Sequence, residues 1–203
     1  MNLREKQKKE TRREIINSAQ EIFSEEKYEK ATISEIAARS GVAEGTIYNY
    51  FSSKGEILIT IFSQMFFQES YEFKEIHEQS DVESEIINFL DFYLNRLKSL
   101  DKALLREAFS LQLKYKHQDK QVFKTFDKMD QKIIGEIKTF LIRLKEKNIL
   151  AQDTDIKNFV EVCYAVFRYN YSDFLMDPDK SYEIFFRELK EKIGYTVDSI
   201  LLS

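Results

Sequence analysis

Residues that interrupt helices are scarce in this chain, which has five glycines and one proline among 203 residues. From Ile57 onward, apolar residues recur at the three- and four-residue spacing of amphipathic helices almost without a pause. Sandwiches and barrels need turns at short intervals, and Gly and Pro supply most of them. The sequence therefore predicts an all-α fold of about nine helices.

Helix starts are marked by three capping boxes, in which a hydroxyl residue and a Glu three positions later bond reciprocally to backbone N–H groups. The boxes begin at Thr11, Thr32 and Ser53, and a further short helix is expected from Val42. Polar clusters then divide the rest of the chain into helices expected at about 54–77, 82–98, 102–115, 119–147, 154–176 and 180–202.

Residues 33–51, with the sequence ISEIAARSGVAEGTIYNYF, have the pattern of two short helices that cross at a steep angle. Ala37 is small enough for the crossing point, and Gly41 tolerates the positive φ of a tight turn. Ile47 and Tyr50 would pack back from the second helix. A plain pair of packed helices would use the same residues, whereas a DNA-binding pair presents the leading end of its second helix to a major groove about 12 Å wide.

The amino-terminal domain of TetR-family repressors is similar to residues 11–58 of this chain, which carry the run Thr32…Ile36-Ala37…Gly41-Val42…Gly45-Thr46-Ile47-Tyr48-Asn49-Tyr50-Phe51…Lys54-Gly55-Glu56-Ile57-Leu58. The rest resembles the family in length and helicity only. The resemblance implies a helix-turn-helix DNA-binding domain over residues 1–53 and a ligand-binding and dimerisation domain over residues 54–203. It also implies a repressor that a small molecule releases from its operator, but it does not identify that molecule. No cofactor and no metal are expected.

The same resemblance implies which residues contact DNA. Phosphate contacts fall on Thr32, Ser34, Tyr48 and Lys54, and base contacts on Glu44, Gly45, Thr46, Asn49 and Tyr50. Some family members have Arg where this chain has Ser34, so we expect Ser34 to contact the backbone alone. Glu44 could accept a hydrogen bond from cytosine or simply stabilise the helix dipole. Tyr48 could instead pack between helices.

Charge is distributed unevenly along the chain, whose net charge is −4. Residues 1–58 are balanced, so the acidic excess lies in residues 59–203. Residues 1–13 contain six basic side chains against only Glu5 and Glu10, which gives this segment a net charge of +4. Such a segment is either a solvated, disordered tail or a source of the positive potential that DNA phosphates require.

The last two predicted helices each carry a broad apolar face. The first face holds Ile156, Phe159, Val160, Cys163, Val166, Phe167, Tyr171 and Phe174, and the second holds Tyr182, Phe185, Phe186, Leu189, Ile193, Ile200 and Leu201. Two such antiparallel helices suit a two-fold dimer that buries a four-helix bundle. Packing within one chain is the alternative, and the family resemblance favours the homodimer.

The middle helices are rich in aromatic residues, which would either fill a core or line an apolar cavity for a lipophilic effector. The candidate pocket residues are Phe62, Phe66, Phe89, Phe92, Tyr93, Arg106, Phe109, Phe126, Phe167, Arg168 and Tyr171. The two arginines would meet an anionic head group, or else form salt bridges. Residues 33–51 also resemble the corresponding segment of family members that sense fatty acyl-coenzyme A thioesters.

Catalysis is not expected, because His77 and His117 lack metal-ligand spacing, Cys163 lies on an apolar face, and no phosphate-binding glycine motif occurs. A single cysteine and the lack of a signal peptide or membrane span predict a cytoplasmic protein. Two alternatives stay open at this stage. One is a helical protein-interaction module, and the other is a ligand-dependent activator with the same fold.

Overall fold

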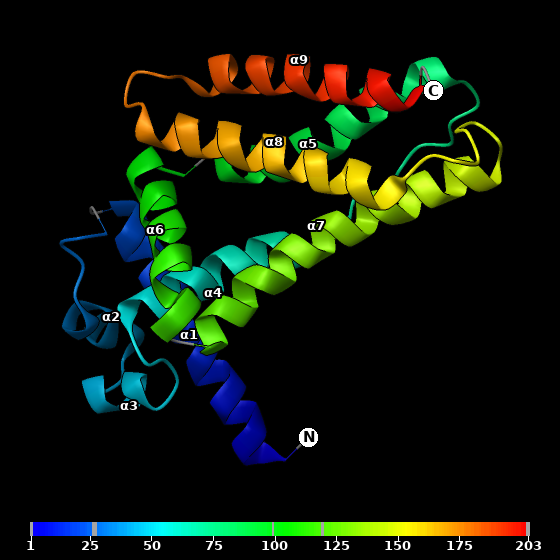
Figure 1. Ribbon diagram of the computed structural model, residues 1–203. Coiled ribbons are helices and arrows are strands. Elements are labelled where there is room, and N and C mark those ends of the chain that lie inside the picture. The colour runs from blue at the N-terminus through cyan, green and yellow to red at the C-terminus, as the bar shows by residue number, and fades with distance from the viewer. Residues whose placement is uncertain (1, 26–27, 99, 119, 202–203) are drawn as a thin grey trace. The chain divides into compact units, whose positions relative to one another are not determined.

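The computed structural model describes residues 2–25, 28–98, 100–118 and 120–201 (Figure 1), with side chains at 115–122 and 199–201 left out. This part of the chain contains nine α-helices and a 3-10 turn, and the all-α prediction is confirmed. The elements are α1 (Leu3–Glu25), α2 (Ile33–Ser40), α3 (Glu44–Tyr48), α4 (Lys54–Phe67), η1 (Gln79–Asp81), α5 (Val82–Lys98), α6 (Lys102–Gln118), α7 (Lys120–Glu146), α8 (Ile156–Met176) and α9 (Tyr182–Leu201).

The helices pack as two compact units. Unit 1 comprises residues 1–68 and 100–127, and unit 2 comprises residues 69–99 and 128–203. Helix α7 therefore contributes its first residues to unit 1 and the remainder to unit 2. The expected domain boundary after residue 53 falls inside unit 1, and a functional division at that point stays a prediction.

Helix α1 begins at Leu3, so the predicted start near Thr11 is wrong. The backbone N–H of Arg4 donates to Asn2 Oδ1 (2.7 Å), and the N–H of Asn2 donates to Glu5 Oε2 (3.2 Å). The Asn2 side chain thus caps the helix nine residues before the Thr11 box. Strong helix formers fill the interval, and nothing in it ends a helix. The basic segment is consequently helical rather than a disordered tail.

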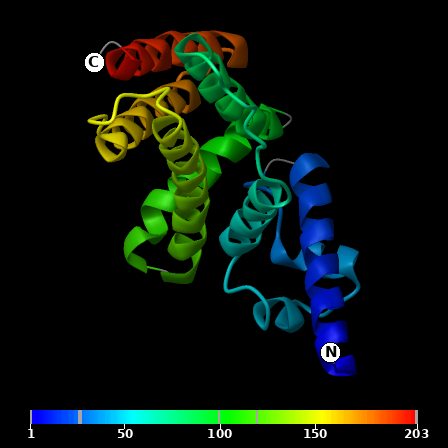
Figure 2. The same ribbon diagram turned by 90° about the vertical axis from the view of Figure 1, so that its right-hand side faces the viewer.

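The core of unit 1 is built from the apolar faces of its helices. Helix α1 packs against α2 and α4, and α4 also packs against α6 (Figure 2). The buried apolar side chains of α1 and α4 are Ile15, Ile16, Ala19, Ile22, Phe23, Ile57, Leu58, Ile59, Ile61, Phe62 and Phe66. This core holds α2 and α3 in place at one end of the unit.

Helix α4 ends at Phe67, so the predicted helix over 54–77 is wrong beyond that residue. Residues 68–78 instead form a non-helical strap. Glu85 on α5 is 2% exposed, and its carboxylate accepts hydrogen bonds from the Tyr71 hydroxyl (3.0 Å) and the Lys74 backbone N–H (2.7 Å). A buried carboxylate without hydrogen-bond donors would be costly. The Tyr71 hydroxyl and the Lys74 N–H supply these donors from the non-helical strap. The other long helices begin and end within three residues of the predictions.

Helices α8 and α9 lie side by side in unit 2 and run antiparallel (Figure 1). Much of the two predicted apolar faces is buried between these helices and α5, including Phe159, Val160, Cys163, Phe174, Phe185, Leu189 and Ile193. Packing within the chain therefore accounts for these residues. Ile200 and Leu201 lie outside the described side chains. In the part of the chain that the structure describes, no helix is both long and apolar enough to cross a bilayer.

Candidate nucleic-acid interface

Hydrogen bonds fix both ends of α2, and its carboxyl-terminal end begins the turn into α3. Thr32 caps the helix, because its Oγ1 accepts from the Glu35 N–H (3.2 Å) while the Glu35 carboxylate accepts from the Thr32 N–H (2.7 Å). The hydrogen bonds from Thr32 lower the pKa of Glu35. At the other end Gly41 has φ 69°, and the following N–H of Val42 bonds to the Ala37 carbonyl at 3.0 Å. This left-handed residue turns the chain sharply into α3.

Helix α3 has five residues and is held by two side chains. Ile47 is fully buried, and Phe51, which follows the helix, is 1% exposed. Ala37 of α2 is buried as well, as the crossing of the two helices requires. The predicted helix-turn-helix is therefore confirmed, and the side of α3 that carries Ile47 faces the core.

Most predicted DNA contacts lie on the surface of this unit. Thr32, Ser34, Glu44, Gly45, Tyr48 and Asn49 are exposed, whereas Thr46 and Tyr50 are half-buried. Tyr48 is 56% exposed, so the alternative in which its ring packs between helices is wrong. Glu44 occupies the first turn of α3, where its carboxylate can stabilise the helix dipole and can also reach a DNA base. Contact with DNA stays a prediction for each of these residues.

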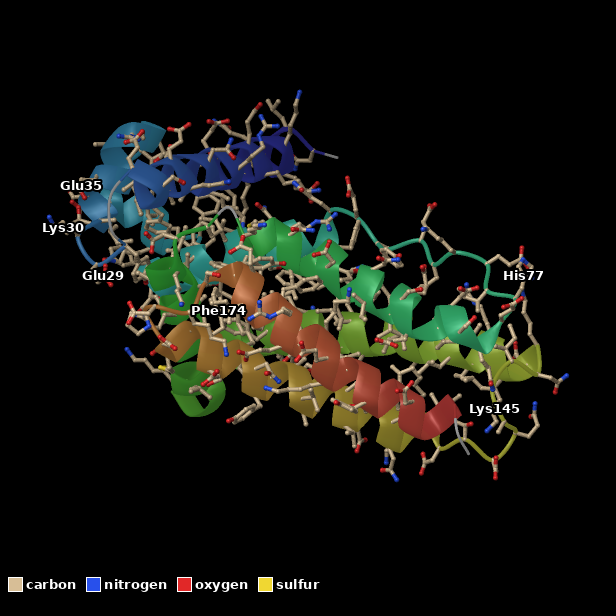
Figure 3. The ribbon with its side chains drawn as sticks, turned by 90° about the horizontal axis from the view of Figure 1, so that it is seen from above. Glu29, Lys30, Glu35, His77, Lys145 and Phe174 are labelled. Atoms are coloured by element: carbon tan, nitrogen blue, oxygen red, sulfur yellow. The ribbon has the colours of Figure 1, made fainter. Side chains whose placement is uncertain are left out.

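Lys54 is held by the protein itself. Its Nζ donates to the backbone carbonyls of Tyr28 (2.6 Å) and Ala31 (2.7 Å), and it lies 4.2 Å from the centre of the Tyr28 ring. Burial lowers the pKa of Lys54, against the opposing effect of acidic neighbours that include Glu29 and Glu35, both labelled in Figure 3. The ammonium group thus joins the first turn of α4 to the connection between α1 and α2. Sequence reasoning assigned Lys54 only to a phosphate and missed this anchoring role.

The candidate effector residues do not form one cluster within either unit. Unit 1 contains Phe62, Phe66, Arg106, Phe109 and Phe126, and unit 2 contains Phe89, Phe92, Tyr93, Phe167, Arg168 and Tyr171. Several are core residues, since Phe89 is fully buried and contacts the rings of Tyr71, Phe73 and Tyr93. Phe167 stacks on Tyr171, whose pKa is raised by burial. None of the eleven lines the groove that unit 2 does contain.

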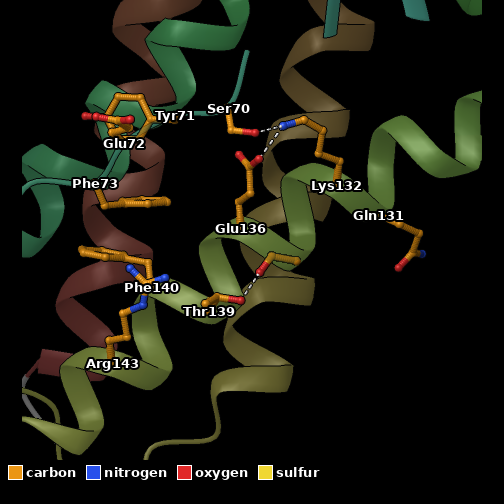
Figure 4. Close-up of a pocket in the computed structure, with 11 residues that line it drawn as sticks. Ser70, Tyr71, Glu72, Phe73, Gln131, Lys132, Glu136, Thr139, Phe140 and Arg143 are labelled. Atoms are coloured by element: carbon orange, nitrogen blue, oxygen red, sulfur yellow. Dashed lines mark hydrogen bonds and ion pairs between the residues drawn. The ribbon is translucent and has the colours of Figure 1, made fainter. Parts of the chain in front are cut away.

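That groove lies between the strap and α7 and has a volume of about 630 Å³ (Figure 4). It is lined by Ser70, Tyr71, Glu72, Phe73, Gln131, Lys132, Gly135, Glu136, Thr139, Phe140 and Arg143. The rings of Phe73 and Phe140 stack at 4.3 Å with an interplanar angle of 10°, which gives the groove an apolar wall. These residues were not predicted from the sequence, because the helical pattern extended over residues 70–73.

Polar side chains tie the strap to the groove. Lys132 Nζ donates to Ser70 Oγ (2.7 Å) and to the Tyr93 hydroxyl oxygen (3.0 Å), and it pairs with the Glu136 carboxylate. The Tyr93 hydroxyl in turn donates to Glu136 (2.6 Å). The strap therefore forms one side of the groove, and α7 forms the other side.

The described residues assemble neither a metal site nor a reactive thiol. They contain no group of three or more His, Cys, Asp or Glu side chains that could hold a metal ion. Burial raises the pKa of Cys163 to about 12, which keeps its thiol protonated near neutral pH. His77 is exposed on the strap, and the side chain of His117 lies outside the described part.

Known proteins resemble this chain at two levels. A model of the family described as "Bacterial regulatory proteins, tetR family" matches residues 15–61. The fatty acid metabolism regulator protein of Bacillus subtilis is 44% identical over 59 residues, which make up 29% of this chain and 30% of that relative. The chain is thus matched to less than a third of the length of that curated relative.

Solved structures extend the likeness to the whole fold. The transcriptional regulator FadR from Bacillus subtilis, in complex with stearoyl-CoA, has a TM-score of 0.61 at 20% identity, over 93% of this chain and 96% of that one. The fatty acid degradation regulator FadR from Bacillus halodurans has a TM-score of 0.58 at 19% identity, over 94% of each chain. At these identities the likeness shows a shared fold.

Replacement of Lys54 by Ala should destabilise unit 1, because it removes two charge-assisted hydrogen bonds and leaves the Tyr28 and Ala31 carbonyls without this donor. We expect a loss of about 1–3 kcal/mol in the free energy of unfolding, measured by urea denaturation. Lys30→Ala is the control, since Lys30 is an exposed lysine of the same connection. Equal stability of the two variants would contradict the anchoring role.

Proposed function

We propose that this chain is a repressor of the tetR family of bacterial regulatory proteins, which binds operator DNA as a homodimer and leaves it when a small lipophilic effector binds. The family model matches residues 15–61, and solved regulators share the fold along the chain. The observation that carries the proposal is the exposure of Glu44, Gly45, Tyr48 and Asn49 around a buried Ile47.

This side of the helix pair suits a DNA duplex. Asn49 can pair bidentately with adenine, and Gly45 leaves room for close approach because a Cβ there would meet no protein atom within 4 Å. Thr32, Ser34 and Tyr48 are exposed hydroxyl groups, which are ordinary donors to phosphate oxygens. The work of such a protein is regulatory rather than catalytic and takes place in the cytoplasm, where bacterial DNA lies.

Operator binding is tested by titrating the purified protein with its own upstream intergenic duplex and with a random duplex at several salt concentrations. Tyr48→Phe should weaken binding to all duplexes alike, since it removes a phosphate donor. Asn49→Ala should relax the preference at one base pair per half-site, at a cost of about 1–3 kcal/mol for the preferred base.

A flat salt response or equal affinity for both duplexes would defeat operator binding. Uniform weakening by Asn49→Ala would remove the base contact. If wild-type protein binds no duplex but binds another protein through the α2–α3 surface, the interaction-module alternative gains support. Transcription that rises when the protein occupies its site would instead identify an activator.

The homodimer is proposed to form through α8 and α9. Apolar side chains remain exposed on α8 at Val162 (50%), Tyr169 (68%) and Met176 (60%). They are seven residues apart, so they form one line along the helix, as the contact positions of paired helices do. On α9, Ile184 and Tyr195 are also exposed. A second copy would cover these side chains, which packing within the chain does not bury.

Tyr169→Glu should disrupt this dimer, because it places a charge in the middle of the exposed apolar line. Analytical ultracentrifugation should then show a monomer, with circular dichroism unchanged because Tyr169 is exposed in one chain. Lys157→Glu tests the effect of a new acidic residue elsewhere on α8, where 77% of the lysine side chain is exposed, and should leave the dimer intact. A dimeric Tyr169→Glu protein would contradict this interface.

The effector is proposed to be lipophilic with a polar or anionic head, and to bind within residues 54–203. The stacked Phe73 and Phe140 rings offer an apolar wall in unit 2, and Arg143 offers a cation in the same groove. The strap that lines the groove at Ser70–Phe73 continues directly from the end of α4 at Phe67. An effector that moves the strap would therefore act on the helix that Lys54 joins to the DNA-binding elements. The eleven aromatic and basic residues of the sequence hypothesis stay candidates for contact with the effector.

Stearoyl-CoA is the first probe, because a FadR of the same fold is known in complex with it. It should release the protein from its operator, whereas coenzyme A alone should not, and by linkage the operator should weaken the binding of the thioester by the same factor. Thr139→Phe, at an exposed position that lines the groove, should abolish release, and Lys138→Phe, its exposed neighbour outside the lining, should not. Release that persists in Thr139→Phe would exclude the groove.

A further inference from the structure

The amino-terminal half of α1 projects beyond the core of unit 1. The first buried residue of the helix is Ile15, and residues 2–10 are all exposed, with Leu3 at 80%. At 1.5 Å per residue the twelve residues 3–14 extend for roughly 18 Å. We call residues 3–13 the basic arm. Because it continues a packed helix and starts with an Asn2 cap, it needs no contacts of its own to be helical.

Basic side chains are arranged along the arm rather than scattered. Arg4, Lys8 and Arg12 are spaced four residues apart and share one face of the helix. Lys6, Lys9 and Arg13 share a neighbouring face, at spacings of three and four. The arm has no apolar stripe that would suit a membrane or a partner helix, since Leu3 is its one apolar residue. Its chemistry is that of a rod with positive charge along much of its surface.

The acidic residues of the arm do not cancel this charge. Glu5 is engaged at the start of the helix, where its carboxylate accepts from the backbone N–H of Asn2. Glu10 is the other acidic residue, so the six cations of the arm exceed its acids by four. Such a surface attracts the regularly spaced phosphates of a duplex.

The arm lies at the end of unit 1 that carries α3. Figures 1 and 2 both show the amino-terminal end of α1 and helix α3 at the same end of the unit. The guanidinium of Arg12 lies 4.9 Å from the centre of the Phe51 ring, and Phe51 closely follows α3. This contact fixes the arm beside the elements that are proposed to meet DNA.

We propose that the basic arm is a second DNA-binding element, which contacts the sugar-phosphate backbone beside the base pairs that α3 reads. The inference rests on the proposed function and adds a contact outside the helix-turn-helix. Its length corresponds to roughly five base pairs of a strand at 3.4 Å each. The arm gives affinity without sequence preference, because it offers charge to phosphates and no groups to base edges.

The test is the triple variant Lys6→Gln, Lys8→Gln and Lys9→Gln in the full chain. Gln has nearly the same helix propensity as Lys, so the arm should stay helical by circular dichroism. The slope of log K against log salt should become shallower by roughly two to three, at about 0.9 per lost phosphate contact. Affinity near physiological salt should fall about tenfold or more, equally for operator and random duplex.

The matched control removes the same charge from exposed lysines elsewhere, by Lys128→Gln, Lys138→Gln and Lys157→Gln. This control should keep the wild-type slope. A triple arm variant with the wild-type slope, or a control that loses as much affinity, would overturn the arm's role while leaving operator binding by α3 intact. A wild-type chain that binds no duplex at any salt concentration would overturn the proposed function and the arm's role together.

Discussion

The burial of Ile47 and Phe51 is the constraint on which the proposed DNA-binding surface depends. A helix as short as α3 is not stable by its own hydrogen bonds, so it exists because these two side chains are held in the core of unit 1. Their burial decides which side of α3 faces inward, and it leaves Tyr48 and Asn49 on the outside. The left-handed turn at Gly41 sets the angle at which α3 leaves α2. The same packing therefore holds α3 in place and exposes the side chains that are proposed to contact DNA.

Local signals in the sequence were sufficient to predict this region and the bounds of most long helices, but not the start of α1 or the course of the strap. The caps at Thr32 and Ser53 and the turn at Gly41 act within a few residues, and each lies where the pattern predicted. The same signal misled at Thr11, because a capping box inside a run of strong helix formers does not end the preceding helix, and the cap at Asn2 was overlooked. The strap could not be predicted, since its course depends on hydrogen bonds to Glu85, which lies outside it in sequence.

Residue roles were harder to predict than helices, because the protein's own groups compete with its partners. Lys54 has a position typical of a phosphate contact, yet backbone carbonyls of the α1–α2 connection accept two of its hydrogen bonds. Aromatic residues such as Phe89 are common to cores and ligand cavities, so composition could not separate the two. The groove wall of Phe73 and Phe140 joins segments that are distant in sequence and has no local signal.

The central claim is that the exposed side of α3 lies against a DNA duplex, and hydroxyl-radical labelling of aromatic rings tests it directly. Tyr48 and Phe67 are 56% and 45% exposed, and neither lies on the proposed dimer surface, so both should be labelled in the free protein. With the protein saturated by its operator duplex, labelling of Tyr48 should fall several-fold while labelling of Phe67 is unchanged. Undiminished labelling of Tyr48 in the saturated complex would contradict the claim.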